Sequence, residues 1–383
     1  SAVDPLAARS DVARIDPNPA IALRFPARTP RSVMPEAIAS LPWGVSKIQA
    51  PAVWSAGFRG AGVVVANEDT GVQWDHPALK AQYRGWNGSS VDHDYNWHDA
   101  VADTACRAGG VSAPCDPNSH GTHTTGTMAG DDGADHPIGV APGARWIHCR
   151  NMDASGTGTT ASYIECLQWL LAPTDLSGAN PNPDLAPDVV NNSWYCAVSE
   201  GCTSGNELAV AVNNLVAGGI FFAAAAGNSG SDCQTIAGPP AIYDAAFVVG
   251  ATDATETLAS FSSRGPVGGS ALIRPDVSAP GVNISSSVPG SGYDIKQGTS
   301  MATPHVAGAA ALLMSAFPAL KGRPAEVVAI LRATAVHDVL DGVPGQNCGS
   351  TPITTWPNFM AGYGRVDAWN AYHELIFIDG LDD

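Results

Sequence analysis

Several short runs of Val, Ile, Phe and Ala end abruptly in Asp or Asn. Residues 62–69 read GVVVANED, residues 188–194 read DVVNNSW, and residues 219–228 read GIFFAAAAGN. Continuous apolar runs without alternating polar residues are typical of strands buried on both faces of a parallel sheet. Stretches with a helical apolar pattern lie between them, such as SYIECLQWLL at 162–171. This alternation of strands and helices predicts a doubly wound α/β domain.

Polar residues at the ends of such strands are the candidates for function, because sites in these sheets lie outside the carboxyl ends of the strands. Asp69 ends an apolar run, His120 begins a short helix of small residues, and Ser300 begins a long apolar helix. A serine becomes a nucleophile when a neutral imidazole accepts its proton and a buried carboxylate orients that imidazole. Backbone amides at the start of the serine helix, with the side chain of Asn228, are suited to bind an oxyanion. The sequence therefore predicts acyl transfer by these four residues.

Four motifs follow one another along the chain: DTG at 69–71, HGTH at 120–123, GN at 227–228 and GTSMATPH at 298–305. Through these motifs the chain resembles the subtilisin-like serine peptidases (subtilases), which share the order Asp, His, Ser. The resemblance extends over residues 41–372. The stretches VVVANEDTGVQWDHPALKAQYRGW and HDYNWHDA are most similar to the bacillopeptidase F-like branch.

This resemblance implies a subtilisin-like three-layer α/β/α fold with a mostly parallel central sheet. It implies a secreted serine endopeptidase that hydrolyses peptide bonds through an acyl-enzyme intermediate. No cofactor is required for that chemistry. We expect the partners to be unfolded or extended polypeptide substrates and the protein to be a monomer.

In the family, an extended substrate lies between two edge segments and pairs with them as an added strand. By motif position these segments consist of Gly156, Thr157, Gly158, Ser193, Trp194 and Tyr195. The primary pocket is expected at Ala225, Ala226 and Gly227, whose small side chains leave room for a large residue before the cut. These segments hold no acidic side chain to bind Lys or Arg. Broad specificity with a preference for large apolar residues is therefore expected.

The charge of the chain argues against two kinds of partner. Its 19 Lys and Arg against 36 Asp and Glu give a net charge of −17, which disfavours nucleic acid and anionic membranes. The longest apolar run, at 219–227, is too short to span a bilayer. We therefore expect neither nucleic acid nor a membrane as a partner.

The chain has eight cysteines, and none of them forms a CxxC pair, so a structural zinc site is not expected. An even number allows complete pairing in an oxidising compartment, which favours an exported protein. Cys106 with Cys115, and Cys196 with Cys202, lie in short polar loops and are predicted to pair locally. The other four are either bridges or buried thiols: Cys149, Cys166, Cys233 and Cys348.

The sequence divides into three parts. Residues 1–40 do not fit the peptidase pattern, and DVARIDPNPAIAL at 11–23 resembles the last strand of a subtilase propeptide. We interpret residues 1–40 as an N-terminal extension or a propeptide remnant. Residues 41–374 form the predicted peptidase domain, and residues 375–383 form an acidic C-terminal tail.

Calcium is expected only as a structural ion. Relatives with a tight calcium site usually carry Asp after the His-Pro that follows the catalytic aspartate, and this chain has Ala78 there. The resemblance places a weaker metal site at Asp276, with carbonyl oxygens near residues 243–246 as further ligands. Alternatively, Asp276 only accepts hydrogen bonds from local amides. We interpret Asp131, Asp132 and Asp135 as part of a solvated loop.

Two other functions explain parts of the sequence. A zinc hydrolase would take its ligands from His93, His98, His120, His123, Asp92, Asp94 and Asp99. The sequence contains no HExxH motif, and a zinc hydrolase would leave Ser300 and Asn228 unexplained. A catalytically silent binding protein is the second alternative, although no member of the Asp–His–Ser set is missing. His123, His305 and Glu68 are interpreted as packed, hydrogen-bonded residues.

Overall fold

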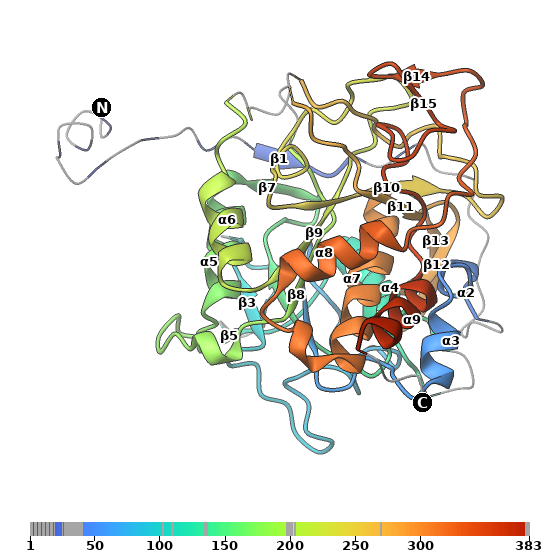
Figure 1. Ribbon diagram of the computed structural model, residues 1–383. Helices are drawn as coiled ribbons and strands as arrows, with labels where there is room; N and C mark the ends of the chain where they lie inside the picture. Colours follow the sequence, from blue (N-terminus) through green and yellow to red (C-terminus); the bar gives the residue numbers. More distant parts are fainter. Residues whose placement is uncertain are drawn as a thin grey trace.

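A sheet of seven strands forms the centre of the molecule, and every neighbouring pair in it is parallel (Figure 1). The computed structural model describes residues 41–379 except 102, 109–110, 134–136, 197–201, 203 and 269, together with residues 3, 6, 9, 12, 15, 18, 20–24 and 26. The strand order across the sheet is β11-β10-β9-β8-β2-β6-β3. In chain order the strands are β2 (Val64–Asp69), β3 (Trp97–Asp99), β6 (Arg145–Arg150), β8 (Val189–Asn192), β9 (Phe221–Ala225), β10 (Phe247–Thr252) and β11 (Val277–Pro280).

Helices cover both faces of this sheet. On one face lie α4 (His120–Ala129) and α7 (Thr299–Ala316), and on the other lie α5 (Thr160–Leu171) and α6 (Ala209–Ala217) (Figure 1). Successive strand residues point to opposite faces: Val65 belongs to the core on the α7 side, and Ala66 to the core on the α5 side. The predicted three-layer α/β/α fold is confirmed.

Four further helices lie on the α7 side of the molecule, namely α2 (Trp43–Lys47), α3 (Ala50–Ser55), α8 (Pro324–Ala333) and α9 (Ala368–Asp379). The predicted start of the C-terminal tail, residue 375, falls inside α9. Leu375 is buried in the same core as α7, so burial of its side chain keeps the helix on the body of the protein. The helix α9 therefore continues past the predicted boundary at residue 374.

Short two-stranded sheets complete the fold. They are β1 (Ala20–Ala22) with β7 (Thr157–Thr159), β4 (Arg107–Ala108) with β5 (Val111–Ser112), β12 (Ile284–Val288) with β13 (Gly292–Lys296), and β14 (Asn347–Cys348) with β15 (Thr351–Pro352). Each pair is antiparallel. The pair β1–β7 joins the N-terminal part of the chain to a loop beside the central sheet (Figure 1).

All eight cysteines are paired. The two predicted local disulfides, Cys106–Cys115 and Cys196–Cys202, are confirmed. The four cysteines whose state was open also form disulfides. They pair as Cys149–Cys166, which joins β6 to α5, and as Cys233–Cys348, which links residues separated by 115 positions.

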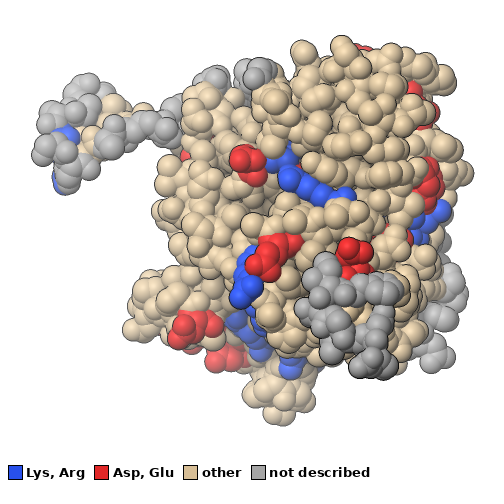
Figure 2. Space-filling view, in the orientation of Figure 1, with Lys and Arg blue, Asp and Glu red and all other residues tan. Residues whose placement is uncertain are grey.

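Charged side chains of both signs lie next to each other on the face drawn in Figure 2. Arg323 pairs with Glu326 at 3.2 Å, and Lys321 pairs with Asp188 at 3.2 Å. Within the described part of the chain, none of the helices combines the length and the apolar character that crossing a membrane requires.

Candidate active site

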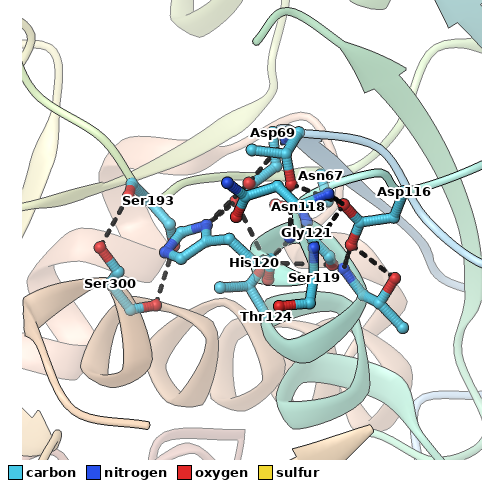
Figure 3. A network of polar contacts seen from close by, with 12 residues as sticks. Asn67, Asp69, Asp116, Asn118, Ser119, His120, Gly121, Thr124, Ser193 and Ser300 are labelled. Carbon is cyan, nitrogen blue, oxygen red and sulfur yellow. Dashed lines mark hydrogen bonds and ion pairs between the residues drawn. The ribbon is translucent and has the colours of Figure 1, made fainter. Parts of the chain in front are cut away.

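Asp69, His120 and Ser300 are brought together from three separate elements. Asp69 is the last residue of β2, His120 is the first residue of α4, and Ser300 is the second residue of α7. The Nδ1 atom of His120 lies 2.7 Å from Oδ1 and 2.8 Å from Oδ2 of Asp69. Both of these side chains are completely buried. The imidazole stands between the Asp69 carboxylate and Ser300, with its other nitrogen toward the serine (Figure 3).

The electrostatics of this pair favour an ionised carboxylate. Burial raises the pKa of Asp69, but the charge of His120, its hydrogen bond and the hydrogen bond from the Thr70 amide lower it more. The pKa of Asp69 therefore lies below its ordinary value. A carboxylate that keeps its charge can hold the imidazole in one tautomer and stabilise the imidazolium form.

Ser300 is held at the start of α7 by two hydrogen bonds with Ser193. Its Oγ atom donates to the Ser193 carbonyl oxygen at 2.7 Å, and the Ser193 Oγ atom donates to the Ser300 carbonyl oxygen at 3.0 Å. The second bond has a local cause. Pro304, four residues further along α7, has no N–H to donate to that carbonyl. Ser193 thus takes the place of a missing helical donor and links the serine helix to the segment directly after β8.

Asp116 connects the Asp69 turn to the start of α4, and the sequence analysis missed it. Its Oδ1 atom accepts from Thr70 Oγ1 at 2.9 Å and from the amides of Asn118 and Ser119 (Figure 3). Its Oδ2 atom accepts from the amide and the hydroxyl of Thr122 at 2.8 and 2.7 Å. Thr70 Oγ1 in turn accepts from the Gly121 amide at 3.0 Å. An acidic residue four positions before a helix start was the available signal, because the first amides of a helix need acceptors.

Asn228 lies beside the start of α7 with its two side-chain atoms in different roles. The Oδ1 atom accepts from the amide of Thr299 at 2.9 Å and from its Oγ1 at 3.0 Å. The Nδ2 atom donates to the carbonyl oxygen of Arg24 at 2.8 Å. The acceptor side therefore fixes the amide, and the donor side points at a peptide carbonyl of the N-terminal segment.

Residues 20–24 lie along the first of the two edge segments that the sequence assigned to substrate. They run antiparallel to β7, with Ala20 opposite Thr159 and Ala22 opposite Thr157. The Leu23 amide continues this ladder by donating to the Gly156 carbonyl oxygen at 2.7 Å. Gly156, Thr157 and Gly158 therefore pair with an extended strand of the chain itself.

In the second predicted edge segment, residues 193–195, the side chains of Trp194 and Tyr195 have different partners. Trp194 is 2% exposed, and its ring stacks on Tyr163 of α5 with 3.6 Å between the ring centroids. Its side chain thus belongs to the core on the α5 side. Tyr195 is 7% exposed, and its hydroxyl lies 2.9 Å from Ser229 Oγ. Ala225 and Ala226 are buried, and Gly227 has a left-handed φ of 104°.

The carboxylate of Asp276 contacts arginines in place of the cation expected from the sequence. Its Oδ2 atom lies 2.8 Å from Arg274 Nη1, and its Oδ1 atom accepts from Arg332. The Nη2 atom of Arg274 also donates to the carbonyl oxygens of Tyr243 and Ala246 at 2.8 and 3.0 Å. One guanidinium thus binds the oxygens that the sequence assigned to a metal. A positively charged side chain at this position does not fit a second cation.

The other acidic candidates have local partners. Asp131 lies 3.4 Å from Arg59, and Asp132 accepts from the Tyr293 hydroxyl at 3.2 Å. Asp135 lies outside the described residues. Ala78 is buried against Ile138 and Tyr293. Among the residues that the structure describes, no three His, Cys, Asp or Glu side chains are grouped as metal ligands.

The histidines of the zinc alternative are dispersed. His93 contacts the Tyr83 hydroxyl, His98 contacts Glu165, and His123 contacts the carbonyl oxygens of Ile284 and Asp294. His305 is also packed and hydrogen-bonded. Its Nδ1 atom lies 2.8 Å from the Met301 carbonyl oxygen, and burial lowers its pKa to about 4.

Glu68 points away from Asp69, into the face of the sheet covered by α5. It is completely buried, and its nearest hydrogen-bond partner is Asn151 Nδ2 at 3.5 Å from Oε2. Its Oε1 atom has no partner among the described residues. Burial, and then the charge of Asp69, raise the pKa of Glu68 well above its ordinary value. The glutamate is therefore a buried carboxyl group that keeps its proton to a higher pH than an exposed glutamate does.

The sequence as a whole points to the same class of protein as this arrangement of Asp, His and Ser at three element ends. The family described as "Subtilase family" matches residues 60–364, and the chain belongs to this family. The resemblance inferred from the motifs is thereby confirmed.

Individual relatives support the same assignment. Bacillopeptidase F of Bacillus subtilis (strain 168) is 43% identical over 352 residues, which cover 88% of this chain and 22% of the relative. Subtilisin E of the same strain is 38% identical over 280 residues, covering 73% of this chain and 62% of the relative. Subtilisin of Bacillus pumilus is 38% identical over 280 residues, which cover 73% of this chain and 86% of the relative. The chain thus spans about a fifth of the length of Bacillopeptidase F.

Proposed function

We propose that this chain is a serine endopeptidase that cleaves polypeptides through Asp69, His120 and Ser300. The observation that carries the proposal is the buried pair of His120 and Asp69, at 2.7 Å, with the imidazole facing Ser300 (Figure 3). A buried carboxylate, an imidazole and a serine hydroxyl in this order are the parts that acyl transfer needs. The chain's membership of the subtilase family supports the same reaction.

In the proposed reaction, the Ser300 Oγ atom leaves its hydrogen bond with Ser193 and attacks the carbonyl carbon of the substrate. His120 takes the hydroxyl proton, and Asp69 stabilises the resulting imidazolium. The carbonyl oxygen becomes an oxyanion, which accepts from Asn228 Nδ2 and from backbone amide at the start of α7. When the peptide bond breaks, His120 donates its proton to the leaving amine. Water then hydrolyses the acyl-enzyme by the same proton transfers in reverse.

Substrates are proposed to bind as added strands in the groove that residues 20–24 occupy. These residues pair with β7 through backbone atoms, and their last carbonyl reaches Asn228. Backbone pairing reads few side chains, so it favours broad cleavage of unfolded or extended polypeptides. Arg24 would then correspond to the residue before the cut.

Residues 1–40 are proposed to act as an extension or propeptide remnant that blocks the groove. A segment that pairs with β7 and with Asn228 competes directly with substrate. Residues 41–374 are proposed as the peptidase domain, and α9 continues from it to Asp379. The four disulfides support secretion into an oxidising compartment, and we propose a monomer that acts there without a metal in the reaction.

Labelling with a fluorophosphonate, followed by peptide mapping, tests this proposal. The reagent should modify Ser300 alone, and Ser300→Ala should remain folded, take up no label and hydrolyse casein slower by on the order of 10⁶-fold. That magnitude was measured on subtilisin, which is a relative of this chain. Casein hydrolysis by Ser300→Ala within about tenfold of the wild type would refute the assignment. A phenanthroline-sensitive activity without labelling would favour a zinc hydrolase, and no activity with no label would favour a silent binding protein.

A further inference from the structure

The space next to Gly227 is occupied. A Cβ atom built on Gly227 would lie 3.0 Å from Ser263 Oγ, and 3.4 Å from Cε1 and 3.5 Å from Cδ1 of Tyr195. The two distances to Tyr195 are ordinary van der Waals contacts, so the tyrosine ring packs directly against the glycine, next to the Ser263 hydroxyl. Because only 7% of Tyr195 is exposed, the ring fills space between the segment 193–195 and the segment 225–227. This is the space that the sequence analysis assigned to a large substrate side chain.

A hydrogen bond holds the ring there. The Tyr195 hydroxyl lies 2.9 Å from Ser229 Oγ, and the Ser229 amide donates to Ser263 Oγ at 3.0 Å. Tyr195 follows β8 and Ser229 follows the neighbouring strand β9, so their bond joins the segments that leave the ends of these two strands. On the tyrosine side, the next residue is anchored as well. Cys196 forms a disulfide with Cys202, and its amide donates to the Pro239 carbonyl oxygen at 2.8 Å.

Arg24 supplies an independent observation. Its carbonyl oxygen accepts from Asn228 Nδ2, which places it at the position of the residue before the cut. The side chain of a residue in an open primary pocket would be buried between the two segments. Arg24 is instead exposed. The segment that occupies the groove therefore binds without filling a deep pocket at this position.

We propose that Tyr195, held by Ser229, closes the primary pocket and determines specificity. This inference rests on the proposed peptidase function and names its substrate class: polypeptides with a small residue before the cut, or with a flexible side chain that extends out of the groove. Rigid aromatic residues are excluded because the tyrosine ring takes their place. The sequence predicted a preference for large apolar residues because Ala225, Ala226 and Gly227 are small. That prediction did not include the ring of Tyr195.

Two peptides that differ only in Ala or Phe before the cut test the proposal on the full chain, after active-site titration. The wild type should hydrolyse the Ala peptide with a kcat/KM about tenfold or more above that of the Phe peptide. Tyr195→Gly should reverse this preference, because it removes the ring that packs beside Gly227. Tyr195→Phe and Ser229→Ala each break the hydrogen bond but keep the ring. They should shift the ratio by similar factors, and by less than Tyr195→Gly.

The ratio of kcat/KM for the Ala and Phe peptides, measured on the wild type, tests the proposal even if Tyr195→Gly does not fold. A wild type that prefers the Phe peptide would overturn the proposal, and so would a Tyr195→Gly variant with an unchanged ratio. Unequal effects of Tyr195→Phe and Ser229→Ala would overturn the role of their hydrogen bond. Fluorophosphonate labelling of each preparation separates these results from failure of the peptidase function. A labelled protein with the wrong ratio contradicts only the pocket proposal, whereas an unlabelled and inactive protein contradicts the proposed function.

Discussion

Asn228 and Arg24 are joined by a 2.8 Å hydrogen bond from a side-chain amide to a peptide carbonyl. Thr299 fixes the other end of that amide by donating to Oδ1 through two atoms. The amide is therefore oriented before any charge develops on a carbonyl oxygen beside it. Preorganised donors of this kind stabilise a transition state without reorganising during the reaction.

The first prediction concerns this donor. Asn228→Ala should lower kcat by roughly 10²–10³-fold with little change in KM, because the amide is needed most when the oxyanion forms. The magnitude comes from an oxyanion donor of subtilisin, a relative of this chain. Thr299→Ala is the matched control, since it removes one bond to Oδ1 but keeps the donor, and it should cost much less. Steady-state kinetics on one peptide decides, and a variant that mainly raises KM would reassign Asn228 to substrate binding.

The second prediction concerns the N-terminal segment. The chain should cut its own peptide bond after Arg24, because the Arg24 carbonyl already meets Asn228 and residues 20–22 pair with β7. Mass spectrometry of the incubated full chain should detect loss of residues 1–24, at a rate independent of protein concentration. Ser300→Ala should keep its full mass. Cleavage of the wild type only at other bonds would contradict the groove assignment of Arg24.

Thr70 and Asp116 carry the third prediction. Thr70→Val removes the hydroxyl that bridges Asp116 and the Gly121 amide, so the Asp69 turn and the His120 helix should lose their alignment. We expect kcat to fall roughly 10- to 100-fold, as for small misplacements of reacting groups, with KM nearly unchanged. Thr70→Ser keeps the hydroxyl and should stay close to the wild type. Equal activity of the two variants would show that this bridge does not position the pair.

The fourth prediction concerns Glu68 and pH. Burial raises the pKa of Glu68 in the folded state, whereas in the unfolded chain it is about 4.3. Below about pH 4.3 the carboxyl is protonated in both states. Above it, the unfolded chain releases the proton while the folded protein retains it, so stability falls as pH rises toward the folded pKa. Glu68→Gln removes this loss, and its advantage in stability should grow with pH.

Urea unfolding between about pH 4 and pH 8 measures this difference. Both proteins should carry Ser300→Ala to prevent self-digestion. Asp69 contributes in the opposite direction, because its pKa is lowered in the folded state. Its stabilising contribution is present above the unfolded pKa and is lost in acid. Both proteins contain Asp69, so this contribution cancels in their difference. A stability difference that is the same at every pH would contradict the raised pKa.

The last prediction compares disulfides with metal. Arg274 binds Asp276 and the neighbouring carbonyl oxygens with its own charge, so EDTA should change the Tm less than a reducing agent does. Replacing both Cys233 and Cys348 by Ala should cost about 4–5 kcal/mol, since that disulfide closes a loop of 115 positions. Calorimetry, with Ser300→Ala in every sample, measures the changes in Tm and the cost of the double replacement. A larger loss of Tm with EDTA than with reductant would indicate a structural cation elsewhere.

Much of the site could be predicted from the sequence because its parts lie in short motifs at the ends of regular elements. Asp69 ends a strand, and His120 and Ser300 begin helices. Parallel strands deliver their carboxyl ends to the same edge of a sheet, so the meeting of these residues follows from the pattern. The local disulfides were predictable for a similar reason, since Cys106 and Cys196 each have a partner within one loop.

Other features depend on side chains that are distant in the sequence. The positions of Tyr195 next to Gly227 and of Arg274 next to Ala246 follow from loops that meet only in the folded chain. Residue size at Gly227 could not reveal that a ring from another loop fills the space. Composition and local pattern thus determined the fold class and the residues proposed to react. The tertiary structure alone decided which groups lie beside Gly227, beside β7 and at Asp276, because packing brings together groups that no local pattern relates.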